Sequence, residues 1–135
     1  SGFLNASGQT YVGYFWAEIP GYSKFGSYRG NGNSDGTFVY LGFKPALVIF
    51  KSTTGENWQM KDSKRAGYND QNHSFFCNAE NSEYTTAQMD LLSNGFKLRL
   101  GGTGSQVAYA VNRASGDTYI YMAFAEQPFR FSNAR

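Results

Sequence analysis

The sequence has one cysteine, one histidine and three prolines among its 135 residues. A single cysteine excludes a disulfide within the chain, and we predict that Cys77 is a small buried residue among apolar neighbours. With His73 as the only histidine and no Gly-x-Ser-x-Gly motif, Ser-His-Asp catalysis is not indicated. The residues that ligate metals are scattered rather than clustered. We therefore predict a protein that is not an enzyme and that has no catalytic residues, no metal site and no cofactor.

Charge is also scarce, since only 16% of the residues are charged and the net charge is +2. The densest basic stretch, residues 61–65, is too short for the clustered Lys and Arg of a nucleic-acid interface. No run of about 18 apolar residues is present, so we expect no membrane insertion. The composition thus predicts neither a nucleic-acid partner nor insertion into a membrane.

Aromatic residues and glycines are abundant, at 18% of the chain and 16 residues respectively. This balance is typical of strands joined by tight turns. The Asn94-Gly95 pair predicts a type I′ hairpin, because both residues tolerate positive φ angles. The sequence predicts an all-β fold, a two-layer antiparallel β-sandwich of jelly-roll-like form. We expect strands at residues 10–18, 37–43, 46–52, 57–62, 74–79, 89–93, 96–100, 107–111 and 118–126.

The two ends of the chain resemble each other. Residues 6–20 align without a gap with residues 114–128, and Ala, Ser, Gly, Thr, Tyr, Ala, Glu and Pro coincide. In one interpretation, residues 1–25 form a strand that resembles the end of a preceding repeat and packs on the same sheet, while residues 26–135 form the sandwich domain. In the other, the two ends are equivalent strands of one sheet.

Residues 118–126 are apolar on both faces. Tyr119, Tyr121 and Ala123 share one face, and Ile120 and Met122 lie on the other. We therefore predict a central strand that is covered on both sides. Glu126, near its end, is expected to reach water or to pair with an arginine.

The loop at residues 31–36 places Asn31, Asn33 and Asp35 at alternate positions, as calcium loops do. It lacks the acidic residue that follows in an EF-hand. Asn and Asp also suit turns because they form hydrogen bonds with their own backbone. The turn interpretation is favoured.

Exposed aromatic and polar residues are the candidate ligand-binding residues, because sugar rings stack on aromatic faces while polar groups bind their hydroxyls. Burial is the favoured interpretation for Tyr28 and Trp58, and a loop-fixing ion pair for Asp62 with Arg65. The candidate ligand-binding residues are Trp58, Asp62, Arg65, Tyr68, Asn69 and Tyr84.

Several motifs stand out when they are taken together: residues 26–32, residues 38–46 with Lys51, Trp58, Asp62 with Arg65, Tyr68-Asn69, residues 93–99 and residues 119–129. Together they resemble a domain found in tail-fibre and virion structural proteins of tailed bacteriophages, many of them marine. The resemblance covers most of the chain.

The resemblance implies a module located in the virion, in a phage tail or fibre. The leading hypothesis is non-catalytic binding of a host surface glycan or receptor. The alternatives are a purely structural module for fibre assembly, with other virion subunits as partners, and an accessory or catalytic domain of a polysaccharide depolymerase. A homo-oligomer is expected, with a trimer favoured.

Overall fold

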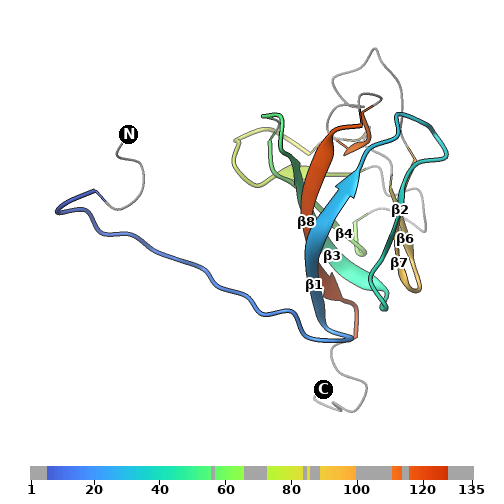
Figure 1. Cartoon of the computed structure of the whole chain (residues 1–135), viewed down its shortest axis with the longest axis horizontal. Coiled ribbons are helices and arrows are strands. Elements are labelled where there is room, and N and C mark those ends of the chain that lie inside the picture. The colour runs from blue at the N-terminus through green and yellow to red at the C-terminus, as the bar shows by residue number, and fades with distance from the viewer. Residues whose placement is uncertain are drawn as a thin grey trace.

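A computed structural model describes residues 6–55, 57–65, 73–83, 85, 89–99, 111–113 and 116–127. In these residues the chain forms eight β-strands, which build two antiparallel sheets packed face to face (Figure 1). The predicted all-β, two-layer antiparallel sandwich is therefore confirmed. The strands are β1 (Ser23–Arg29), β2 (Phe38–Tyr40), β3 (Pro45–Ser52), β4 (Gln59–Asp62), β5 (Phe75–Phe76), β6 (Met89–Leu92), β7 (Gly95–Leu98) and β8 (Thr118–Ala125).

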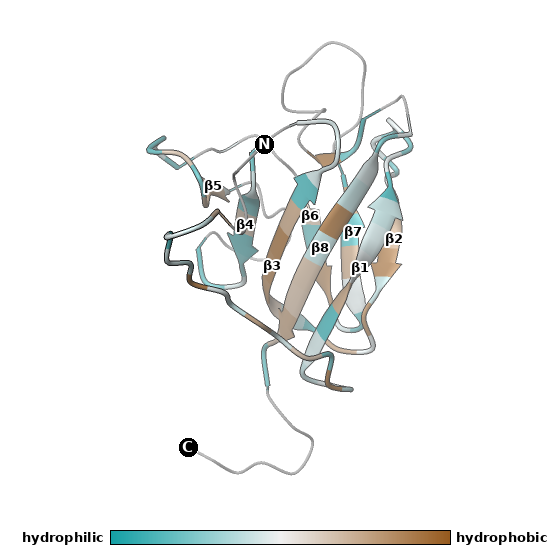
Figure 2. Cartoon of the chain, turned by 60° about the vertical axis from the view of Figure 1, so that its left-hand side comes forward, coloured by the Kyte–Doolittle hydropathy of each residue, from teal (hydrophilic) through white to brown (hydrophobic). Residues whose placement is uncertain are grey.

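The larger sheet has five strands in the order β1-β8-β3-β4-β5. Its middle strand is β3, and β8 is the internal strand beside it, which pairs along its length with β1 on one side and with β3 on the other. β3 and β8 carry most of the hydrophobic colouring in this sheet (Figure 2). The strand that was expected to be central is therefore internal, between β1 and β3, but it is not the middle strand of the sheet.

The smaller sheet has the order β2-β7-β6, and a tight hairpin joins β6 to β7. The hairpin was predicted, but its turn lies one residue earlier, at Ser93 and Asn94, because Leu92 pairs with Gly95. Gly95 begins β7 and serves a different need: a Cβ there would lie 2.0 Å from the carbonyl oxygen of Val39. Glycine therefore allows β2 to approach β7.

The core lies between the two sheets and is rich in aromatic rings. Tyr28 of β1 stacks on Tyr119 of β8 with ring centroids 4.9 Å apart, and Phe96 of β7 packs edge-on against Tyr28 and Tyr121. The Tyr28 hydroxyl donates to the carbonyl of Val111, and burial raises its pKa well above the usual 10.0. Phe96 is fully buried, so its truncation to Ala should cost about 4 kcal/mol.

The outer face of β8 differs from the prediction that both faces are covered. Ile120 is 41% exposed, and Met122 and Phe124 are half-buried. The reason is that the small sheet covers only the side of β8 on which Tyr119, Tyr121 and Ala123 are buried. Among the described residues, therefore, no second layer covers the outward side of this strand.

Cys77 is exposed, so the prediction of a buried cysteine is wrong. Strand β5 is only two residues long, and Cys77 falls in the turn that follows it. Its backbone N–H still donates to the carbonyl of Trp58. The turn therefore holds the backbone against β4 while the side chain faces outward.

Candidate functional site

The six candidate residues from the sequence are only partly placed by the structure. Tyr68, Asn69 and Tyr84 lie outside the described residues. Asp62 ends β4, Arg65 follows it in a turn, and Trp58 immediately precedes the same strand. The described candidates therefore gather at the two ends of β4.

Asp62 and Arg65 form the predicted ion pair, and a second carboxylate joins them. Arg65 also contacts Glu83, with 3.2 Å between Nη1 and Oε1, and His73 Nδ1 lies 3.0 Å from the other Glu83 oxygen. The hydrogen bond with His73, helped by Arg65, lowers the pKa of Glu83 below its usual 4.5. The Arg65 guanidinium also lies 3.8 Å from the ring centre of Phe75. These contacts connect three distant stretches of chain, as expected of a group that fixes loops.

Trp58 is half-buried, which is intermediate between a core residue and an open stacking platform. Its backbone N–H donates to Asn78 Oδ1, and Asn78 Nδ2 donates to Asn57 Oδ1. The ammonium of Lys51 lies 5.8 Å from the Trp58 ring centre. We call Lys51, Asn57, Trp58 and Asn78 the Trp58 ledge, since an aromatic ring lies there beside exposed amides and a cation.

An open pocket of about 330 Å³ lies at the end of β8 and is lined by Phe43, Lys44, Ala125, Glu126 and Gln127. Among the described residues, Glu126 pairs with two lysines rather than with the expected arginine: Lys44 at 2.7 Å and Lys64 at 3.8 Å. The hydrogen bond from Lys44 lowers the pKa of Glu126 below its usual 4.5. Because this carboxylate already has two cationic neighbours, the pocket has little charge to offer a ligand.

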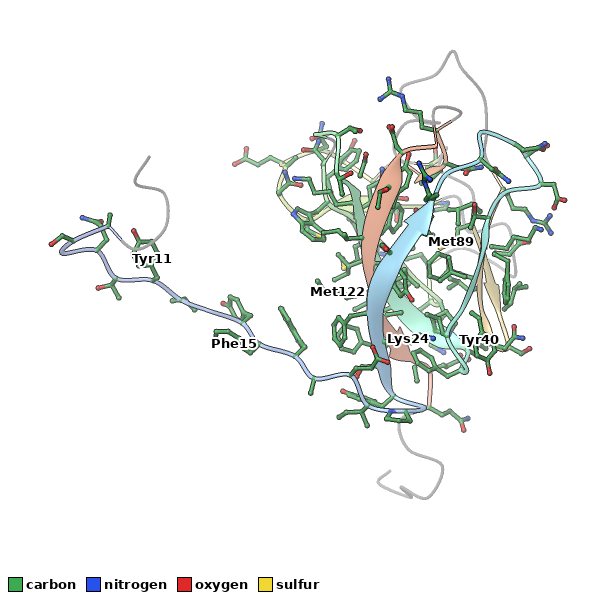
Figure 3. All side chains as sticks on the ribbon, in the orientation of Figure 1. Tyr11, Phe15, Lys24, Tyr40, Met89 and Met122 are labelled. Atoms are coloured by element: carbon green, nitrogen blue, oxygen red, sulfur yellow. The ribbon has the colours of Figure 1, made fainter. Side chains whose placement is uncertain are left out.

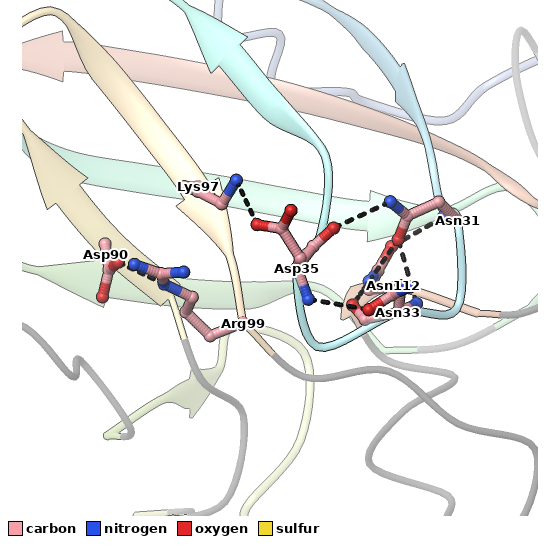
Figure 4. Close-up of polar contacts among 7 residues, drawn as sticks. All are labelled: Asn31, Asn33, Asp35, Asp90, Lys97, Arg99 and Asn112. Atoms are coloured by element: carbon pink, nitrogen blue, oxygen red, sulfur yellow. Dashed lines mark hydrogen bonds and ion pairs between the residues drawn. The ribbon is translucent and has the colours of Figure 1, made fainter.

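The loop after β1 is built from Asx turns (Figure 4). Asn31 Oδ1 accepts from the backbone N–H of Asn33, and Asn33 Oδ1 accepts from that of Asp35. The buried Asn112 fastens this loop with three hydrogen bonds, to the Asn31 N–H, to Asn31 Oδ1 and to the Asn33 carbonyl. Asp35 pairs with Lys97 at 2.6 Å, and the hydrogen bond from Lys97 lowers the pKa of Asp35. The side-chain oxygens considered for calcium are therefore engaged within the protein.

The feature that the site predictions missed is an extended N-terminal arm, residues 6–18. The arm leaves the sandwich at the start of β1 and runs away from it, with Tyr11 and Phe15 far from the body (Figures 1 and 3). Phe15 is 95% exposed, Val12 78% and Tyr14 76%, and Tyr11 and Trp16 are also exposed. We expected a strand at residues 10–18 packed on the sheet, yet in the described chain only residues 23–25 of the first 25 lie in a strand. Whether the arm belongs to a preceding repeat stays a prediction.

The similarity between the arm and β8 extends to backbone conformation at one position. Gly8 and Gly116 occupy equivalent places in the two segments, and their φ angles are 76° and 74°. The following residues differ in environment, since Tyr119 is fully buried whereas its counterpart Tyr11 is exposed. The arm thus has the sequence of a central strand without its pairing.

The exposed hydrophobic residues of the described body lie near the edge next to the arm. Ile120, on the outer face of β8, is paired with Ser27 of β1. Tyr40, 60% exposed on β2, lies beneath the ammonium of Lys24, which also donates to the Tyr40 carbonyl at 3.0 Å (Figure 3). Phe38 is exposed on the same strand. We call Ser23–Arg29, Phe38, Tyr40 and Ile120 the β1 edge surface.

A family model for a domain of unknown function, DUF7483, matches residues 1–128. The chain belongs to the DUF7483 family. The matched range includes the arm together with the sandwich. No curated protein matches the chain, and no solved structure matches it.

The part of this DUF7483 domain that the structure describes lacks two features. Its His, Cys, Asp and Glu residues form no group of three or more that could hold a metal ion. None of its described residues forms a helix long and apolar enough to cross a membrane. The features that remain for this domain are the arm, the β1 edge surface and the Trp58 ledge.

Proposed function

We propose that this domain is a non-catalytic assembly module of a tailed-phage tail or fibre, which joins protein chains in the virion through its N-terminal arm. The observation that carries the proposal is the exposure of five large apolar side chains on one extended segment. The resemblance of most of the sequence to tail-fibre and virion structural proteins supports the phage context.

The exposed apolar side chains of the arm favour its association with another surface. An extended segment cannot bury its own side chains, and covering a large apolar side chain is worth about 2 kcal/mol. Five such residues in one segment therefore provide several kcal/mol for association with another surface. Residues 6–17 carry no charged side chain, so an apolar protein surface suits the arm better than a charged ligand.

Sedimentation velocity of the whole chain tests this function. We expect association at micromolar concentrations that is lost in the double variant Phe15→Asp and Trp16→Asp. The matched control is Thr53→Asp with Asn81→Asp, which adds the same charge at exposed positions outside the arm. Association that is absent in the wild type, or equal in both variants, would refute an assembly role for the arm.

Recognition of a host glycan or receptor is the second candidate, and the Trp58 ledge is the observation that favours it. An aromatic ring beside exposed amides and a lysine is the combination that sugar-binding surfaces use. Binding to polysaccharides or host cells that disappears in Trp58→Ala, and persists when the arm is altered, would support this role. A lack of binding by the wild type to any such surface would oppose it.

A further inference from the structure

We propose that the arm of one copy adds to the free edge of β1 in a second copy as an antiparallel strand. This inference rests on the proposed assembly function and names its partner and acceptor surface.

The free edge of β1 presents backbone groups that can accept a strand. The Gly30 N–H donates to Asp117, and the Tyr22 carbonyl accepts from Ala125, so the even-numbered residues face β8. The N–H and C=O groups of Ser23, Phe25, Ser27 and Arg29 therefore point the other way. Among the described strands, none pairs with this side of β1.

Contacts at both ends show that this edge makes hydrogen bonds. Ile19 and Ser23 exchange two backbone hydrogen bonds, of 3.2 and 2.9 Å, which form one antiparallel rung. At the far end the Thr37 hydroxyl donates to the Arg29 carbonyl at 2.6 Å. Between these contacts the described residues supply one partner, the Glu18 carboxylate, which lies 3.5 Å from the Phe25 N–H. No described strand occupies the middle of the edge, which can therefore accept one.

The register of the single rung predicts how an arm would lie. If the arm of one copy takes the same register on β1 of a second copy, it places residues 15 and 13 opposite Ser27 and Arg29. Phe15 would then lie on the outer face, in the same row as Ser27 and the exposed Ile120. Tyr14 and Trp16 would lie on the other side, where Lys24 reaches Tyr40. The arm would thus cover residues of the β1 edge surface on both sides.

The local hydrogen bonds favour a second copy over the arm's own β1. The Ser23 hydroxyl accepts from the Ile19 N–H and donates to the Ala17 carbonyl, at 3.1 and 2.8 Å. These bonds hold residues 17–19 against Ser23, and the arm beyond them runs away from the sandwich (Figure 1). Thirteen residues span about 43 Å when extended, which is enough to reach β1 of a neighbouring molecule.

The area also suits a pair of copies that exchange arms. An aromatic side chain buries about 200 Å² when fully covered. If half the surface of the four aromatic residues is covered, each arm loses about 400 Å² and its acceptor loses a similar area. A twofold pair with two arms then buries about 1,600 Å² in total, the size of a standard stable interface.

Disulfide trapping between separately purified chains tests the inference in a Cys77→Ser background. One chain carries Gly13→Cys on the arm, and the other carries Arg29→Cys on β1. We expect the mixture to give a disulfide-linked dimer on a non-reducing gel, at least tenfold more than Gly13→Cys mixed with the exposed control Thr53→Cys. The distance fits, because residues opposite each other in antiparallel strands have Cα atoms about 5.5 Å apart.

Other outcomes overturn the inference and are distinguishable from failure of the proposed function. A cross-link that forms only within one chain carrying both cysteines would mean that the arm folds onto its own β1. Trapping no stronger than the control, with sedimentation still dependent on the arm, would place the arm on another surface and leave the assembly role intact. If the wild-type chain does not associate in sedimentation, both the assembly function and the strand addition are refuted.

Ser27→Pro gives a second readout that does not depend on cysteine chemistry. Proline removes an N–H that faces the free edge and leaves the pairing with β8 in place, as edge strands tolerate. We expect the dissociation constant of the dimer to rise at least tenfold, while the near-ultraviolet circular dichroism of the protein is unchanged. A dimer of unchanged affinity in a folded Ser27→Pro protein would contradict strand addition at this edge.

Discussion

Removing the Asn112 side chain should be among the most damaging changes outside the apolar core. Asn112 is fully buried, and its amide makes hydrogen bonds of 2.8, 3.0 and 2.8 Å with Asn31 and Asn33. It fastens the loop that follows β1. Replacing it by alanine leaves a backbone N–H and a backbone carbonyl without these partners.

The expected size of the effect comes from those three bonds. Each is worth about 1 kcal/mol net, so Asn112→Ala should lower the free energy of unfolding by about 3 kcal/mol. For a domain of this length 1 kcal/mol corresponds to about 4 °C in Tm, which predicts a fall of about 12 °C.

Calorimetry or near-ultraviolet circular dichroism on heating measures the change, with Asn33→Ala as the matched comparison. Asn33 is exposed and its side-chain oxygen accepts one hydrogen bond, from Asp35, so this variant should lose about 1 kcal/mol or less. If Asn112→Ala melts within about 3 °C of the wild type, or no lower than Asn33→Ala, the reasoning is refuted.

Three further predictions concern other parts of the molecule. Gly95→Ala should cost about 3 kcal/mol or more in urea unfolding, because its Cβ would meet a backbone carbonyl of β2 at 2.0 Å, whereas Gly13→Ala in the arm should be neutral. Hydrogen bonds lower the pKa values of Glu83 and Glu126 in the folded state, so their stabilisation is present above the usual 4.5 and should be lost as pH falls through the lowered values; Glu126→Gln should flatten this acid dependence. Exposed Cys77 should react fully with a thiol reagent in the folded protein, and a reaction that needs denaturant would contradict its placement.

The sequence predicted those elements that have a local signal, either an apolar run or a turn motif. Residues 46–52 and 118–126 were expected as strands from their apolar runs, and they form β3 and β8. The hairpin between β6 and β7 followed from a turn signal, although the turn lies at Ser93 and Asn94. Each of these signals is contained in a short segment of chain, so it can be recognised without knowing the tertiary structure.

The features that the sequence did not predict depend on contacts between segments that are far apart in the chain. Residues 10–18 have the composition of a strand, but pairing requires a partner edge, and composition does not say whether one is within reach. The outward exposure of Ile120 likewise depends on where the second sheet ends. At the candidate site, the ion pair of Asp62 with Arg65 was visible from a spacing of three residues. Its connection to Glu83, 18 residues beyond Arg65, was not.

The position of β8 has a consequence for how the chain reaches its native state. Among the described strands β8 is the last along the chain, and it pairs with β1 about 100 residues earlier and with β3 about 70 residues earlier. Until residues 118–125 are available, β1 and β3 have no common neighbour, and the larger sheet is split in two. Closing loops of that length costs conformational entropy before the strands can pair, so folding should be slow for a chain of this size. During synthesis on the ribosome, the larger sheet can therefore form only after β8 has emerged.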